Sequence, residues 1–145
     1  METDVRPNTL FIVTGACLRA ERFDRPLAAR IRAAAELRLR TRLQEEPDVV
    51  ILSDVWYLNS RELHVIPTIS VGGPGVNHLA AYWQRKLPAA LLVENVFQIQ
   101  MDVRAPDTRC SIWGMDHAST AEAVETFITR NHLDRFLECF PKNIA

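Results

Sequence analysis

The sequence has few cysteines, and their positions exclude the usual cross-linked domains. Cys17, Cys110 and Cys139 are the three cysteines among 145 residues, and none belongs to a C-x-x-C pair or a Cys/His pattern with zinc-ligand spacing. An odd number of isolated thiols argues against a disulfide framework. We therefore expect free thiols in a reducing cytoplasmic compartment, and we predict no metal site. The sequence assigns no cofactor.

The sequence also lacks a long apolar run and an excess of one charge. The first apolar run covers only residues 10–13 and follows acidic residues, so it predicts neither a signal peptide nor contact with a membrane. The 17 basic and 18 acidic residues nearly cancel, which argues against a nucleic-acid partner. With 48% hydrophobic and 24% charged residues, the chain has the composition of one globular domain spanning residues 1–145.

Hydrophobic periodicity predicts an α/β fold. Apolar runs indicate strands at residues 9–14, 49–52 and 65–71. A fourth strand is expected to begin at 90–93 and to include the alternating residues 97–103, and residues 109–114 are expected to return as its antiparallel partner. Helical spacing predicts helices at 27–44, opened by Asp24 and Pro26, at 76–87, and from a capping box at 119–122, with a break near 131–132. We expect a three-layer Rossmann-like sandwich with a mainly parallel sheet and one antiparallel hairpin, residues 97–113, at its edge.

Ligands of such sheets bind at the carboxyl ends of parallel strands. This rule selects Thr14 to Cys17, Ser53 with Asp54, the glycine-rich loop 72–77, and Asp116 with His117. Gly72, Gly73 and Gly75 permit close backbone approach, and the following helix start offers unpaired N–H groups to an anion. The spacing matches no standard phosphate-binding motif, so a tight turn with Asn77 as helix N-cap is the alternative.

Two further kinds of site deserve comparison with this loop. Cys17 and His117 are a candidate nucleophile and base, with Asp54 or Asp116 to orient the imidazole. A buried, inert cysteine and an exposed histidine are the simpler alternative. Trp56 with Tyr57 could stack a base, and one helix could bind phosphates through Arg30, Arg32, Arg38, Arg40 and Arg42. Interspersed glutamates favour a solvated helix face instead.

Part of the second half of the chain resembles a known group of domains. The segments 69–77, 112–116 and 120–124 are similar to the V-G-G, G-x-D and T-A pattern of cell-wall-binding and S-layer-type α/β modules. The resemblance implies a non-enzymatic, exported module in which the glycine-rich loop is a structural turn. The chain departs from that pattern in lacking a recognisable signal peptide, and residues 54–59 have no counterpart in it.

These observations lead to a first hypothesis about function. We expect the domain to bind a small anionic ligand, with a nucleotide as one candidate, through Gly72, Gly73, Gly75 and Asn77, and with Ser53, Asp54 and Asn59 on the same rim. The alternatives are a structural or protein-interaction module and a cysteine-dependent hydrolase or transferase. The chain also has three Trp and six Phe but only three substantial helices to cover a sheet, so we expect part of its apolar surface to stay uncovered. This predicts a homodimer formed through the alternating strand or the C-terminal helix.

Overall fold

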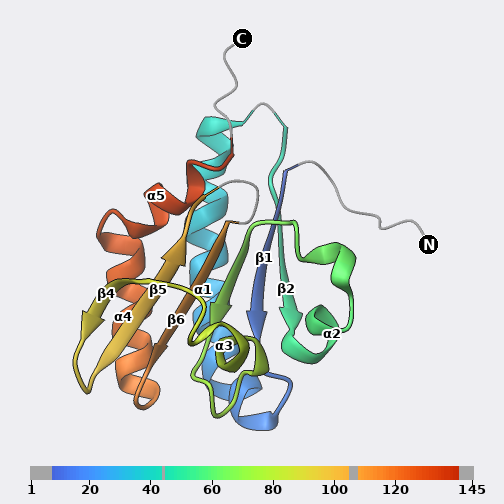
Figure 1. The fold of residues 1–145 in the computed structure, drawn as a ribbon. Helices are drawn as coiled ribbons and strands as arrows, with labels where there is room; N and C mark the ends of the chain where they lie inside the picture. Colours follow the sequence, from blue (N-terminus) through green and yellow to red (C-terminus); the bar gives the residue numbers. More distant parts are fainter. Residues whose placement is uncertain (1–7, 44, 105–107, 141–145) are drawn as a thin grey trace.

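Six strands form one mixed sheet with the order β2-β1-β3-β6-β5-β4 (Figure 1). The structure is a computed structural model that describes residues 8–43, 45–104 and 108–140. The strands are β1 (Thr9–Thr14), β2 (Asp48–Ser53), β3 (Thr68–Val71), β4 (Ala89–Val93), β5 (Phe97–Asp102) and β6 (Arg109–Gly114). β1, β2, β3 and β6 are parallel, whereas β5 and β4 continue the sheet in antiparallel pairing. The predicted mainly parallel sheet with an antiparallel side is confirmed.

The predicted position of the 97–113 hairpin is wrong in one respect. β5 and β6 do form the hairpin, but β5 lies between β6 and β4, and β4 is the outermost strand. Asn95, at φ 63°, lies in the short connection that turns the chain back from β4 to β5. The alternation of β5 therefore reflects its two faces: Phe97, Ile99 and Met101 enter the core, while Gln98 and Gln100 point to the opposite face.

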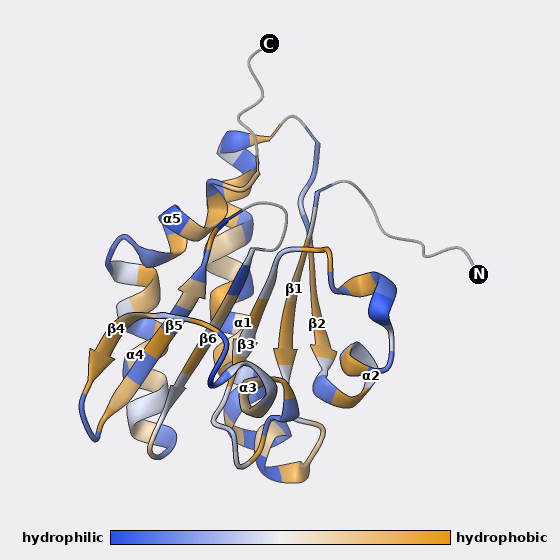
Figure 2. Cartoon of the chain, in the orientation of Figure 1, coloured by the Kyte–Doolittle hydropathy of each residue, from blue (hydrophilic) through white to orange (hydrophobic). Residues whose placement is uncertain are grey.

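Helices pack against both faces of the sheet. They are α1 (Leu18–Arg42), α2 (Asp54–Leu58), the short 3-10 helix η1 (Arg61–Leu63), α3 (His78–Trp83), α4 (His117–Thr129) and α5 (His132–Leu137). α1, α4 and α5 share the larger core with inward residues such as Leu10 and Ile12 of β1. On the opposite face, Phe11 and Val13 pack with Tyr57, Leu79 and Trp83. Because both faces are covered, β1 and β2 are apolar along most of their length (Figure 2).

The first helix begins earlier than the sequence predicts. α1 starts at Leu18 with Cys17 as its N-cap residue, so the prediction that Asp24 and Pro26 open the helix is wrong. Asp24 is instead buried within the helix body, and Pro26 also lies inside the helix. Ala20, Ala28 and Ile31 are buried on the same side of α1. Because this apolar stripe packs in the core, the helix continues through Pro26. Helix propensity alone would place the start of a helix at this proline.

The C-terminal helices follow the prediction more closely. α4 ends at Thr129 and α5 starts at His132, which confirms the predicted break. The N-cap residue of α4 is Asp116 rather than Ser119, however, and the Asp116 side chain accepts a hydrogen bond from the Ser119 amide. The helix therefore begins with a polar N-cap side chain, as predicted, but this side chain lies three residues earlier in the sequence. The third strand is shorter than predicted: it was expected over residues 65–71, but β3 starts at Thr68, just after Pro67, which cannot donate a backbone hydrogen bond.

Candidate functional site

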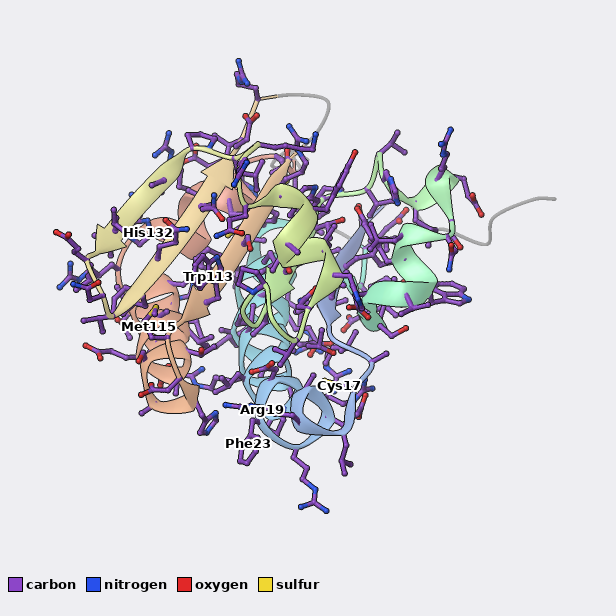
Figure 3. The ribbon with its side chains drawn as sticks, turned by 60° about the horizontal axis from the view of Figure 1, so that its bottom comes forward. Cys17, Arg19, Phe23, Trp113, Met115 and His132 are labelled. Carbon is purple, nitrogen blue, oxygen red and sulfur yellow. The ribbon has the colours of Figure 1, made fainter. Side chains whose placement is uncertain are left out.

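A cleft of about 400 Å³ opens at the carboxyl ends of the parallel strands. Its walls come from the start of α1, the loop between β3 and α3, and the loop between β6 and α4. Its polar side chains belong to Arg19, Asp24, Asp116, His117 and Thr120, and its larger apolar ones to Phe23, Pro74, Val76, Trp113 and Met115. In Figure 3, Arg19 and Phe23 lie on the side of α1 that faces Met115. The cleft is large enough for a small organic ligand.

Asp24 is the buried charged group of this cleft. It is 6% exposed, and its carboxyl group makes no hydrogen bond or ion pair with the described residues. Burial raises the pKa of Asp24 to about 6, while the positive charges of His117 and Arg19 act to lower it. A buried acid without a hydrogen-bond donor costs stability, so such groups are retained mainly at functional sites.

Gly72 makes room for this carboxyl group. It has φ 109°, a conformation that side chains disfavour, and a Cβ atom there would lie 2.5 Å from Asp24 Oδ2. The sequence prediction gave Gly72 a direct role toward a ligand. In the structure, Gly72 directly follows β3, and because it has no side chain, its backbone can pack against the carboxyl group of Asp24 in α1.

Arg19 and His117 line the cleft from α1 and from the start of α4. Both side chains are exposed, and Arg19 makes no ion pair or hydrogen bond within the described ranges. The His117 ring packs against Phe23, with ring centroids 5.0 Å apart. Asp116 adds a second carboxyl group, and hydrogen bonds from the Ser119 side chain and amide lower the pKa of Asp116. The cleft therefore contains side chains of both charges.

The glycine-rich loop forms one wall of the cleft. Gly73 and Gly75 line it, and their amides donate no hydrogen bond within the part of the chain that the structure describes. The Gly73 carbonyl accepts hydrogen bonds from the amides of Val76 and Asn77, which closes the turn. A Cβ atom on Gly75 would meet nothing within 4 Å. The loop is therefore a tight turn along the cleft, and the amides of Gly73 and Gly75 have no acceptor among the described residues.

Asn77 lies beneath this loop rather than in the cleft. Its buried side chain accepts hydrogen bonds from the amides of Leu79 and Ala80, which confirms the predicted N-cap role. Its amide nitrogen donates to the carbonyls of Val13 and Val71 and to the Ser70 hydroxyl. All of its polar atoms are thus used within the protein, and Asn77 holds the ends of β1 and β3 together.

The other predicted rim residues do not line the cleft. The carboxyl group of Asp54 is fully buried and accepts hydrogen bonds from the amides of Ala16, Val55 and His78 and contacts the His78 ring. Ser53 accepts from the amide of Trp56, and Asn59 donates to the carbonyl of Val55. These three side chains therefore stabilise the start and end of α2 and its contact with the α1 and α3 starts.

The structure does not group Cys17 with His117. Cys17 is exposed, and its Sγ lies 3.9 Å from the Val76 carbonyl oxygen. Figure 3 places it on the other side of the α1 start from Phe23, the residue that His117 contacts. Asp54 is occupied by His78. Within the described residues, no group of His, Cys, Asp and Glu side chains could hold a metal ion.

The arginines of α1 interact mainly with other parts of the protein. Arg30 pairs with Glu125, Arg38 with Asp134, and Arg40 with Glu36 and Glu46. Arg42 donates to the Phe140 carbonyl. Trp56 is exposed whereas Tyr57 is buried against His64, so these two aromatic residues do not form one stacking surface.

Arg19, Phe23 and Asp24 were not predicted as site residues, because the sequence analysis took Asp24 as the N-cap of the helix and left Arg19 and Phe23 before its start. One signal could have found Asp24. Ala20, Asp24 and Ala28 recur every four residues on the stripe that continues to Ile31, so an acidic residue interrupts an otherwise apolar helix face. An acid at such a position is unusual enough to indicate a site.

No protein-family model matches the chain, and no curated protein matches its sequence. Within the described residues, no helix is both long enough and apolar enough to cross a membrane. The geometry of the cleft therefore carries the functional argument.

Proposed function

We propose that the protein binds a small ligand through an anionic group, in the cleft between α1 and the loops after β3 and β6. The observation that carries this proposal is that Arg19, Gly73 and Gly75 line the same cleft, while the Arg19 side chain and the two glycine amides make no hydrogen bond with the described residues. Backbone amides and a guanidinium are the donors that carboxylates and phosphates prefer. Phe23 and Trp113 add aromatic surface for an apolar or planar part of the ligand, so a nucleotide remains a candidate.

The proposed architecture agrees with this location. We propose a Rossmann-like, three-layer arrangement, because β1 leads through α1 to β2 on one side, whereas β3 leads through α3 toward the opposite side of the sheet. In sheets of this kind, the strand order reverses between β1 and β3, and ligands bind beside that point. The Gly73–Val76 wall of the cleft follows β3 directly.

Titration with inorganic phosphate and with AMP, followed by calorimetry, tests the proposal. Arg19→Ala should weaken binding of either anion about tenfold, the usual effect of losing a charged hydrogen-bond donor. Arg22→Ala is the matched control, since Arg22 is an exposed arginine of the same helix that does not line the cleft. Equal losses in both variants, or no binding to the wild-type protein, would contradict the proposal.

A second pair of substitutions tests the loop. Ala side chains at positions 73 and 75 fit the fold, because the nearest atom to a Cβ on Gly73 is 3.8 Å away and nothing approaches one on Gly75. The double variant Gly73→Ala, Gly75→Ala should keep its unfolding transition and lose anion affinity, since the methyl groups crowd the amides. Unchanged affinity would show that the loop is only a turn. Cys17→Ala should bind as the wild-type protein does.

We also propose a second copy of the chain as partner, paired along the outer edge of β4. Ala89–Val93 contains no charged residue and is exposed at four of its five positions, and Figure 2 shows it as an apolar edge. Its flanks carry opposite charges, Lys86 before the strand and Glu94 after it. Antiparallel pairing about Leu91 would bring Glu94 of each copy within about two residues of Lys86 of the other, a distance that long side chains can span.

A further inference from the structure

The charges of the cleft suggest a more specific class of ligand than an anion. Arg19 and the free loop amides attract negative charge, but Asp24 and Asp116 line the same cleft and repel it. The carboxyl group of Asp116 is occupied by hydrogen bonds from Ser119. The carboxyl group of Asp24 makes no hydrogen bond or ion pair with the described residues, although Asp24 is only 6% exposed. Asp24 is therefore an acceptor in the cleft that lacks a donor.

We propose that Asp24 binds an ammonium group of the ligand, so that the cleft takes small zwitterions that carry an amine beside their anionic group. This inference rests on the proposed anion site. The anionic group meets Arg19 and the amides of the 73–75 loop, and the amine meets the carboxylate of Asp24 next to Gly72. A charge-assisted hydrogen bond from an ammonium group compensates the desolvation of a buried carboxylate better than a neutral donor does.

Three features of the site support this assignment. Gly72 has the backbone conformation and the missing side chain that allow the carboxyl group to lie against the loop. The pKa of Asp24, about 6, leaves the group ionised at pH 7.5 in spite of burial, so it can pair with a cation there. The charged groups around it are Arg19 of the same helix and His117 of α4, and neither holds it in a hydrogen bond.

Two probes that differ only in the amine test the proposal: ethyl phosphate and O-phosphoethanolamine, titrated at pH 7.5 and followed by calorimetry or amide chemical shifts. The wild-type protein should bind O-phosphoethanolamine about tenfold more tightly than ethyl phosphate, the gain typical of one charge-assisted hydrogen bond. Asp24→Asn should bring this ratio close to one while retaining affinity for ethyl phosphate. Asn is nearly the same size, and the lost carboxyl group makes no hydrogen bond to the described residues, so the variant should fold.

Asp116→Asn is the matched control, because it removes the same charge from the same cleft while Asn still serves as an N-cap. Equal loss of the ratio in both variants would overturn a direct contact with Asp24 and indicate only a general field effect. A ratio near one in the wild-type protein, with ethyl phosphate still bound, would overturn the inference and leave the anion site intact. Failure to bind either probe or inorganic phosphate would overturn both proposals.

Discussion

Close backbone approach at Gly15 fixes how β1 joins α1. A Cβ atom on Gly15 would lie 1.9 Å from the Val76 carbonyl oxygen, so the two loops touch through their backbones. Gly15→Ala should lower the free energy of unfolding by about 2–4 kcal/mol, because the loops must separate or the helix start must shift. Gly75→Ala is the control, and it should be nearly neutral. Urea denaturation compares the two, and similar transitions would contradict the predicted contact.

Asp24 should link stability to pH in the opposite direction from an ordinary ion-paired acid. Its pKa in the folded protein, about 6, is above the normal value of 3.8, so the folded state binds this proton more tightly. The resulting stabilisation is fully present below pH 4 and is lost as the pH rises through about 6. The free energy of unfolding of Asp24→Asn should therefore exceed that of the wild-type protein by on the order of 1–2 kcal/mol at pH 7.5.

Thermal unfolding of the two proteins from pH 4 to pH 8 measures this effect. The difference between Asp24→Asn and the wild-type protein should shrink toward zero as the pH approaches 4. Asp116→Asn provides the reverse case, because the pKa of Asp116 is lowered and its ionised form is favoured in the folded state. A constant difference across the pH range would rule out Asp24 as the titrating group.

At the scale of elements, apolar runs predicted strands well and helix ends less well. β1 and β2 appear within about one residue of the predicted ranges because their apolar runs are bounded by polar or turn residues. The 90–93 run, predicted to begin the same strand as 97–103, instead forms the separate strand β4. α1 was misjudged at its start because Pro26 and Asp24 have the chemistry of a helix opening, and only tertiary burial of Ala20 reveals the earlier turns. Asp24 was overlooked as a site residue for the same reason.

Pro26 is therefore a weak point of α1 that can be tested. Proline lacks the N–H that would bond the Arg22 carbonyl, and its side chain is exposed, so nothing in the core requires it. Pro26→Ala should raise the free energy of unfolding by about 1–3 kcal/mol. Urea denaturation measures the gain. A loss of stability instead would indicate that α1 needs a bend at this position to pack against the sheet.

At the scale of the whole molecule, the sequence predicted that some apolar surface stays exposed for contact with a second copy of the chain. It did not predict which strand or helix carries that surface. The alternating strand was the expected contact, yet Phe97 of β5 is buried and β4 covers the edge. The short 90–93 run shows no periodicity that distinguishes an interior strand from an outer one. Its place at the edge depends on which strands pair across the sheet, and that is a property of the entire fold.

The β4 proposal predicts a dimer that a single charge abolishes. Leu92 is 61% exposed, and Leu92→Lys puts a charge on the edge that two copies would share. Leu37→Lys is the matched control, because Leu37 is 67% exposed on α1, away from β4. Sedimentation at high micromolar concentration should give a dimer for the wild-type protein and the control and a monomer for Leu92→Lys. A monomeric wild-type protein would show that β4 remains unpaired.

The buried carboxyl group of Asp54 fills an anion-binding site that is formed where the starts of α1, α2 and α3 meet. The carboxyl group is equivalent to an acetate ion tethered to the chain and bound by three amides and a ring nitrogen. Asp54→Ala should empty that site, and free acetate should refill it. The melting temperature of the variant should then rise with acetate concentration, but not with chloride at equal ionic strength. Removal of one side chain would thereby make folding itself a response to a metabolite.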